Sequence, residues 1–375
     1  MSTVKATNFQ NASSATANMV TDASGNVSFG GTAAMSSSFL RNRIINGNML
    51  IDQRNAGASV TPVNTQYTID RYQSQISQTA KYSVSQSSTA PVGFSKSLLV
   101  TSLSAYSVLA ADFFAVGQAI EGYNISDFNY GTADSTTATL SFWVRSSLTG
   151  TFGGAINSGS GSFPFTYSIA SANTWTNISV AISANTAYAP TSTTNGVGLY
   201  VWFGLGVGST FSGTAGSWQS GFKESATGAT SVVGTSGATF YVTGVQLEVG
   251  TVATPFERQI YSNQLAQCQR YYEEWGGGDA YQAFGIADAI SATVAYSALQ
   301  YLVTKRAAPS GSVSAASNFH TVRGGVAFTD FTFGSLTTTS TLATITVASG
   351  LTAGQAYTYR ANGTLNARIK FNAEL

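Results

Sequence analysis

Few side chains in this 375-residue sequence could carry out acid–base, nucleophilic or metal chemistry. The chain contains one histidine, His320, and one cysteine, Cys268. A single histidine excludes a histidine-rich zinc site, and the sequence has no cluster of cysteine and histidine. A Ser-His-Asp triad would have to use His320, which lies in the loop-like stretch ASNFHTVRGG. We therefore expect no catalytic residue of these kinds.

The aspartates and glutamates of the sequence leave one class of enzyme possible, the glycoside hydrolases. Glycoside hydrolysis needs only two carboxyl groups at a suitable separation. The closest group in the sequence is Glu273, Glu274, Asp279 and Asp288. Adjacent glutamates on a helix point in directions about 100° apart, so Glu273 and Glu274 would make a poor facing pair. The sequence favours a protein that is not an enzyme, with a polysaccharide depolymerase as an alternative.

Oxygen ligands for a structural calcium ion are present but are not organised as a motif. Asp112, Glu121 and Asp127 could contribute to such a site. No ligand loop of fixed spacing accompanies them. We therefore expect no cofactor and no metal site, with bound calcium as the alternative.

Glycan binding is the chemistry that the composition suits better. Sugars are recognised by flat aromatic faces together with neutral hydrogen-bonding groups. The chain has 18 tyrosines, 22 phenylalanines and 5 tryptophans, many of them in Gly/Ser-rich stretches. Any single aromatic residue is more often part of a core or interface than a sugar platform. The candidates are Tyr188, Trp202, Trp218, Phe222 and Trp275.

The chain carries unusually little charge. Only 9% of its residues are Asp, Glu, Lys or Arg, against roughly 25% in an average domain. A net charge of +1 gives no long-range field that would attract nucleic acid. No stretch reaches the roughly 18 apolar residues of a membrane span, and the first residues lack the apolar core of a secretion signal. We expect no nucleic-acid partner and no membrane insertion.

The few charges gather beside an apparent strand in RNRIINGNMLIDQRNAG, residues 41–57, and around a predicted helix. Such charges could pair across a subunit or domain junction, where an unpaired partner would be costly if buried. The alternative is ordinary surface pairs of little energetic value. Candidate junction residues, including an apolar helical stripe, are Asp52, Arg54, Asp70, Arg71, Glu257, Arg258, Tyr261, Leu265, Cys268, Arg270 and Tyr272.

Strand patterns dominate the elements that must position these residues. Short alternating runs separated by Gly, Ser, Asn and Thr predict a jelly-roll β-sandwich over residues 39–258. In TLSFWVR, for example, Leu140, Phe142 and Val144 fall on one face. Strand patterns return over residues 279–375 and predict a smaller C-terminal β-sandwich domain. The expected fold class is therefore all-β.

One helix is predicted between these domains, over residues 259–278. Pro255 precedes it, Ser262 or Asn263 could cap it, and a glycine run ends it. Its apolar stripe either covers one end of its own sandwich or packs about a threefold axis.

Residues 1–38 predict an N-terminal arm with too few large apolar groups to form a core. Within it, NMVTDASGNVSFGG predicts a hairpin around a Ser-Gly turn, too small to be stable alone. The arm must therefore pack on its own body or dock on a partner as an anchor.

Five stretches of the sequence are informative together: FLRNRIINGNMLIDQRN, YTIDRYQ, VTGVQLEVGTVATPFERQIYSNQLAQCQRYYE, VTKRAAPS and ARIKFNAEL. In combination they resemble a family of bacteriophage and prophage tail-fibre or virion proteins with a carbohydrate-binding-like jelly roll. The resemblance covers about residues 39–375, and the middle strands match only in pattern. One departure is Tyr72, where the family would have tryptophan after Asp-Arg.

The resemblance implies a virion component, commonly a homotrimer, that is assembled in the host bacterial cytoplasm without enzymatic chemistry. We expect a tail fibre or spike that contacts a host surface glycan or protein. Its arm would attach to other virion proteins, with the C-terminal domain distal. The alternatives are a head decoration or collar fibre, and the depolymerase named above.

Overall fold

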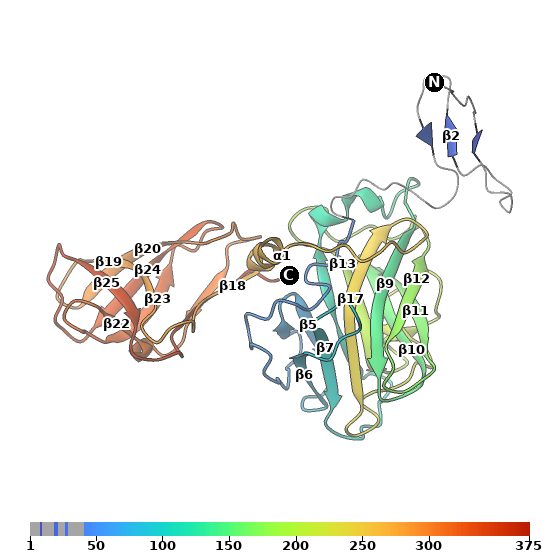
Figure 1. Ribbon diagram of the computed structural model, residues 1–375, viewed down its shortest axis with the longest axis horizontal. Coiled ribbons are helices and arrows are strands. Elements are labelled where there is room, and N and C mark those ends of the chain that lie inside the picture. Colours follow the sequence, from blue (N-terminus) through green and yellow to red (C-terminus); the bar gives the residue numbers. More distant parts are fainter. Residues whose placement is uncertain (1–7, 10–18, 22–26, 29–40) are drawn as a thin grey trace, which may run out of the picture.

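The computed structural model describes residues 8–9, 19–21, 27–28 and 41–375. Two β-sandwiches lie on either side of one helix, α1 (Tyr261–Gln269), and the C-terminus lies beside this helix (Figure 1). The prediction of an all-β chain with a jelly roll, a linking helix and a smaller C-terminal sandwich is confirmed.

The jelly roll contains one sheet of seven strands and one of five. In spatial order, the larger sheet is β15 (Gln219–Ser220), β11 (Gly161–Ile169), β10 (Gly150–Ser158), β13 (Val197–Val207), β8 (Phe113–Glu121), β5 (Tyr72–Ile76) and β4 (Tyr67–Ile69). The smaller one is β12 (Thr176–Ile182), β9 (Ala138–Ser146), β17 (Thr239–Val249), β7 (Ser97–Ser102) and β6 (Tyr82–Ser87). All these pairs are antiparallel.

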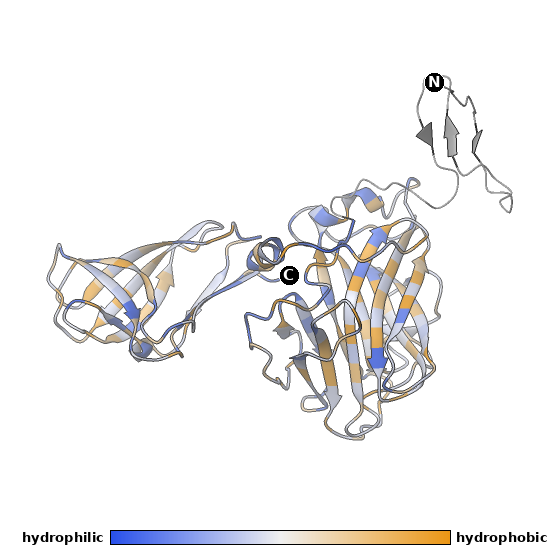
Figure 2. Cartoon of the chain, viewed as in Figure 1, coloured by the Kyte–Doolittle hydropathy of each residue, from blue (hydrophilic) through white to orange (hydrophobic). Residues whose placement is uncertain are grey.

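Alternating apolar residues from both sheets form the core between them. Leu140, Phe142 and Val144 of β9 are fully buried, as their spacing predicted. Phe142 meets Phe203 of the opposite sheet edge to face, with ring centres 5.0 Å apart. Figure 2 shows this alternation as orange and pale bands along the strands, while α1 is among the hydrophilic segments.

The segment between β13 and β17 crosses the outer face of the seven-stranded sheet. It contains β14 (Ser212–Gly213) and β16 (Ser225–Ala226), which pair in parallel. A Cβ atom on Gly153 or Gly204 would lie only 2.5 or 2.6 Å from Ser225 Oγ. The segment therefore rests directly on the sheet, where only glycine leaves it room.

The C-terminal domain packs a sheet of three strands against a sheet of six. Its small sheet is β18 (Tyr272–Gly276), β26 (Arg368–Asn372) and β21 (Ser310–Val313). Its large sheet is β22 (Phe319–Thr321), β25 (Ala356–Ala361), β19 (Ala283–Ala289), β20 (Val294–Gln300), β24 (Ser340–Val347) and β23 (Phe328–Gly334). Within residues 41–375 there are also three short 3-10 helices: η1 (Gly122–Asn124), η2 (Ser126–Phe128) and η3 (Ala316–Asn318).

The predicted helix over residues 259–278 is wrong in extent. Helix α1 has nine residues, and Ile260, not Ser262 or Asn263, occupies its N-cap without a side-chain hydrogen bond. The helix ends early because β18 pairs with β26 along its full length, from Tyr272 opposite Asn372 to Gly276 opposite Arg368. Tertiary strand pairing overrides the helical spacing there.

In the N-terminal region, β2 (Met19–Thr21) pairs antiparallel with β1 (Asn8–Phe9) and β3 (Val27–Ser28). The predicted hairpin strands are thus present. The rest of the predicted arm lies outside the described residues. Across the part of the chain that the structure describes, no helix has the length and apolar content to cross a membrane.

Candidate functional site

The densest ionic cluster lies where the C-terminal end of the chain meets the jelly roll. Glu374 forms ion pairs with Arg54 at 2.9 Å and with Arg71. Arg71 is 1% exposed, donates to the carbonyl oxygen of Ala119 at 2.5 Å, and lies 3.6 Å above the ring of Tyr271. These contacts join the two sandwiches within one chain.

Glu121 at the end of β8 forms the second ionic contact of this junction. Arg270 donates to both of its carboxylate oxygens, at 2.5 and 3.0 Å. The hydroxyl of Tyr271 donates to the same carboxylate at 2.5 Å. Glu121 is 2% exposed, so these charge-assisted bonds satisfy a carboxylate that burial would otherwise destabilise.

Asp70 connects the jelly roll to the start of β18 through Gln53. It accepts from the backbone N–H of Gln53 at 2.7 Å and from its side-chain amide at 2.6 Å. The same amide donates to the carbonyl oxygen of Tyr272 at 3.0 Å. Burial raises the pKa of Asp70 to about 6, although nearby Arg54 and these hydrogen bonds lower it.

The other junction candidates occupy different places. Asp52 accepts from the N–H groups of Asn55 and Gly57 in its own turn. Glu257 accepts from the N–H of Asn42, and the Arg258 guanidinium lies 4.8 Å from the ring centre of Phe94. Asp52, Glu257 and Arg258 therefore do not connect the two sandwiches of this chain, because their partners belong to the jelly roll. A contact of these residues with a second subunit stays a prediction.

The four residues of the predicted apolar helical stripe also differ in their environment. Cys268 and Tyr272 are buried, and burial raises the pKa of the Cys268 thiol. Leu265 is half-buried and Tyr261 is 57% exposed. A contact of Tyr261 with a second subunit stays a prediction.

The ion pairs of Glu374 lead to a testable prediction about how the two domains are held together. Replacing Glu374 with alanine leaves the Arg71 guanidinium buried without its ionic partner, which typically costs about 3–5 kcal/mol. We expect the C-terminal domain to detach from the jelly roll. Small-angle X-ray scattering should then report a larger radius of gyration, and limited proteolysis should cut near α1. Asp288→Asn, an exposed acid of the same domain, is the control.

If the Glu374→Ala variant keeps the wild-type scattering curve, the ionic contacts of Glu374 do not hold the two domains together.

Among the predicted sugar-binding aromatics, Trp202 was a wrong prediction. Its exposed fraction is 0%, it lies on β13 outside the core cluster between the two sheets, and it is stacked on Tyr200 with ring centres 5.3 Å apart. A Cβ atom on Gly117 would lie 2.4 Å from its ring. Trp202 therefore has no face to offer a sugar.

Three other aromatics are partly engaged by their own chain. Trp218 packs on Tyr130 and Phe163 and donates its ring N–H to the carbonyl oxygen of Ser183 at 2.8 Å. Tyr188 is half-buried against Gly161. Phe222 is 40% exposed. Sugar binding by Trp218, Tyr188 or Phe222 stays a prediction.

Trp275 lines a groove in the C-terminal domain. We name this hollow the Trp275 groove; its volume is about 540 Å³, and its walls include Trp275, Gly278, Gln282, Phe284, Gln300 and Leu302. It opens because β19 pairs with β20 only at Asp288 and Ala289, so the other ends of these strands separate. A half-buried tryptophan, a second aromatic ring and two neutral amides thus face one open space.

Trp275 is held in place by a buried carboxylate. Its ring N–H donates to Glu273, and its ring meets Phe371 edge to face at 5.3 Å. Glu273 also pairs with Lys305, and both side chains have an exposed fraction of 0%. The ring orientation in the groove is therefore fixed before any ligand arrives.

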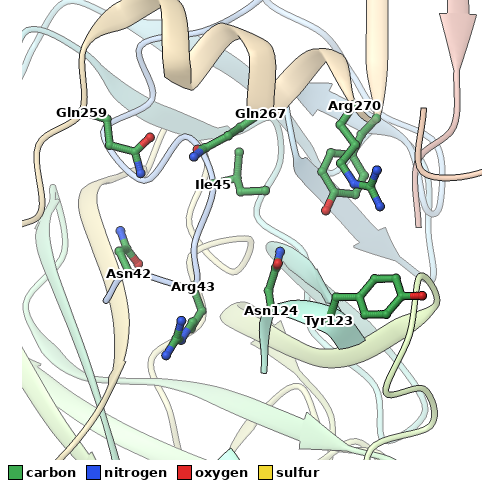
Figure 3. Close-up of a pocket in the computed structure, with 9 residues that line it drawn as sticks. Asn42, Arg43, Ile45, Tyr123, Asn124, Gln259, Gln267 and Arg270 are labelled. Atoms are coloured by element: carbon green, nitrogen blue, oxygen red, sulfur yellow. The ribbon is translucent and has the colours of Figure 1, made fainter. Parts of the chain in front are cut away.

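A second hollow lies against α1, and we name it the α1 pocket. Its volume is about 210 Å³, and its walls are Asn42, Arg43, Ile45, Tyr123, Asn124, Gln259, Gln267, Arg270 and Tyr271. Figure 3 shows Gln259 and Gln267 reaching in from the helix side and Asn124 from the opposite side. The jelly roll and the linking helix both contribute walls.

The proposed calcium ligands do not meet. Asp112 accepts from Ser77 and Tyr106, Glu121 binds Arg270, and Asp127 pairs with Arg43. Within the described ranges, no group of three or more His, Cys, Asp or Glu side chains could hold a metal ion. The calcium hypothesis for these carboxylates has no support in this geometry.

Sequence reasoning missed the partners that complete these clusters. Glu374 and Lys305 were visible as rare charges in ARIKFNAEL and VTKRAAPS, which supplied a usable signal. Gln267 and Asn124 gave none, because neutral amides are abundant throughout the chain.

No protein-family model and no curated protein matches the chain. Among solved structures, it is similar to the enzymatically active domain of tailspike protein 4 from bacteriophage CBA120, at 12% identity and a TM-score of 0.32. The match covers 56% of this chain and 22% of that one.

Two carbohydrate-binding proteins of Clostridium thermocellum are also similar. The family 11 module of the cellulase Lic26A-Cel5E matches at 13% identity and a TM-score of 0.26, over 53% of this chain and 99% of that one. The CBM22-1–GH10 modules of xylanase 10B, complexed with xylohexaose, match at 11% identity and a TM-score of 0.28. This match covers 53% of this chain and 30% of that one. The sheet order of this chain, not these distant matches, defines its sandwich.

Proposed function

We propose that this chain is a glycan-binding structural protein without enzymatic activity, and that the Trp275 groove is its sugar site. The observation that carries the proposal is the half-buried indole of Trp275, fixed by Glu273 and facing a groove of about 540 Å³. This volume falls within the roughly 300–1,000 Å³ of typical ligand sites.

The chemistry of the groove suits a neutral sugar. Trp275 and Phe284 offer apolar ring surface for the C–H face of a pyranose. Gln282 and Gln300 offer amide donors and acceptors for its hydroxyl groups. Glu274 at the margin is already paired with Arg368 and Lys370, so the groove has little free charge.

The same ion pairs argue against hydrolysis. Glu273 is buried with Lys305, and Glu274 is engaged by two cations. Neither carboxylate is placed as a free acid beside a free base, as glycoside hydrolysis requires. The chain thus binds a surface polysaccharide without cleaving it.

The wider role that we propose is that of a virion fibre or spike. The resemblance of residues 39–375 to phage tail-fibre proteins supports it, as does the weakly charged surface. In this role the chain forms homotrimers, attaches to other virion proteins by its N-terminal arm, and presents the C-terminal domain to the host. Antibody labelling of intact particles tests the location: tail labelling is expected, and labelling of the capsid alone would favour a head decoration.

The groove itself is tested by Trp275→Ala. We expect about a 30-fold loss of affinity for the bacterial surface polysaccharide that the wild type selects on a glycan array, as for a typical aromatic hot spot. Trp175→Ala, a half-buried tryptophan on the jelly roll, is the matched control and should bind normally.

Because Trp275 also packs on Phe371, a second variant separates binding from folding. Gln300 is exposed, so Gln300→Ala should weaken binding several-fold with an unchanged unfolding curve. Wild-type affinity in both variants, or release of reducing sugar by the wild type, would contradict the proposal.

A further inference from the structure

The α1 pocket has the features of a second binding site, separate from the Trp275 groove. Its walls come from four parts of the chain: the stretch around Arg43, the 3-10 helix η1, the residues before α1, and α1 itself with the two residues that follow. The pocket is thus built where the linking helix meets the jelly roll (Figure 3).

Three amide side chains in this pocket have no protein partner. Within residues 41–375, the side-chain amides of Asn124 and Gln267 make no hydrogen bond, and the buried Oε1 of Gln259 has no donor. Asn42 differs, because its amide already binds Val245 and Leu247. Buried polar groups are normally satisfied, so the buried Oε1 of Gln259 lacks a donor from its own chain. The half-buried amides of Asn124 and Gln267 are free to bind a hydrogen-bonding ligand.

The charged walls are already neutralised by their own chain. The Arg270 guanidinium binds Glu121, and Arg43 pairs with Asp127 at 2.5 Å. The remaining wall residues are neutral amides, Ile45, the fully buried Tyr271 and Tyr123, which is 60% exposed. This combination suits a neutral polyhydroxyl compound better than an anion or a cation.

The volume limits the ligand further. About 210 Å³ is below the roughly 300–1,000 Å³ of sites for drug-sized molecules. A single sugar ring matches this space, whereas an oligosaccharide would have to extend out of the pocket.

We propose that the α1 pocket binds one neutral monosaccharide unit through Asn124, Gln259 and Gln267, with Tyr123 beside the ring. Since Asn124 belongs to the jelly roll and Gln267 to α1, a bound sugar connects the helix to the jelly roll. Binding therefore also stabilises this contact. The site does not depend on the Trp275 groove.

Saturation-transfer NMR on the full chain tests this with D-glucose, D-galactose, N-acetyl-D-glucosamine and L-rhamnose. At least one of these sugars is expected to bind the wild type and to raise its melting temperature. Gln267→Leu should weaken that binding about tenfold, as should Asn124→Ala, because each removes hydrogen bonds to the ligand. Asn263→Ala, on an exposed position of the same helix, is the control and should bind normally.

The Trp275→Ala variant distinguishes the two sites. Monosaccharide binding that persists in Trp275→Ala and is lost in Gln267→Leu assigns it to the α1 pocket, whatever the fate of the Trp275 groove. Absence of binding by all four sugars, or equal binding by wild type and Gln267→Leu, would overturn the proposal. Tighter binding of D-glucuronate than of D-glucose would overturn the neutral ligand class.

Discussion

Replacing Glu224 with glutamine is expected to stabilise the protein at neutral and alkaline pH. Glu224 lies on the segment that crosses the outer face of the seven-stranded sheet, and it is 2% exposed. Its Oε2 atom has no hydrogen-bond partner among residues 41–375. Burial raises the pKa of this carboxyl to about 8, so ionisation is costly in the folded chain.

The neighbours of Glu224 explain why its charge is not compensated. Lys223 directs its ammonium group to the carbonyl oxygen of Thr210 at 2.8 Å. The backbone N–H of Glu224 donates to the carbonyl oxygen of Phe211, which fixes the segment but leaves the carboxyl group unpaired. An unpaired buried carboxylate loses the hydration that it has in the unfolded chain.

The sign of the pH effect follows from proton binding. The folded chain holds the Glu224 proton more tightly than the unfolded chain, whose ordinary pKa is 4.5. Stability is therefore full below about pH 4.5 and falls as the pH rises toward 8. The loss is on the order of 5 kcal/mol, since each unit of pKa difference corresponds to about 1.4 kcal/mol.

Urea unfolding at pH 5 and at pH 8.5 measures this effect. The advantage of Glu224→Gln over the wild type should be small at pH 5 and several kcal/mol at pH 8.5. Glu248→Gln is the matched control, because Glu248 is equally buried but accepts hydrogen bonds from Thr254 and Gln246. That variant should be destabilised. An advantage of Glu224→Gln that does not change with pH would contradict the argument.

The strands were the most predictable part of the fold. Alternation in TLSFWVR placed Leu140, Phe142 and Val144 in the core because one face of that strand is buried. The extent of α1 was not predictable in the same way. Tyr272 continues the apolar spacing of the helix, yet it belongs to a strand whose partner, Asn372, lies one hundred residues further along the chain.

The candidate sites were only partly predictable for a related reason. Trp202 and Trp275 both lie in aromatic, glycine-containing stretches, so composition ranks them equally. Trp202 is fully buried against Gly117 and Tyr200, and nothing in its own stretch of sequence signals that burial. Arg54 and Arg270 were recognisable because charge is rare here, but their partners, Glu374 and Glu121, depend on tertiary contacts.

Lys305→Met is expected to be the most destabilising single change in the C-terminal domain. The Lys305 ammonium binds Glu273 and donates to the carbonyl oxygen of Gln269 at 2.6 Å. Both members of the ion pair have an exposed fraction of 0%. Burial lowers the pKa of Lys305, and the Glu273 carboxylate opposes that shift. Removing the cation leaves a buried, uncompensated carboxylate.

The expected cost of Lys305→Met is about 3–5 kcal/mol in the free energy of unfolding, measured with urea at pH 7. Lys370→Met is the matched control. Lys370 also pairs with a glutamate of β18, Glu274, but at 3.5 Å and with 38% of its side chain exposed, so its loss should cost at most about 1 kcal/mol. Equal costs for the two variants would show that burial of the Lys305 pair does not matter.

A double variant distinguishes the loss of the Lys305 cation from the effect of leaving the Glu273 carboxylate unpaired. Glu273→Gln combined with Lys305→Met removes both charges and keeps a side-chain oxygen that can accept from Trp275 and from the N–H of Leu302. Its stability should recover most of the loss, because the penalty comes from the unpaired carboxylate. Since Glu273 also orients the indole, sugar binding in the Trp275 groove should fall in Lys305→Met and return in the double variant. These expected results would show that the stability of this domain, and the proposed sugar binding, depend on the acceptor oxygen at position 273 and on whether its charge is compensated.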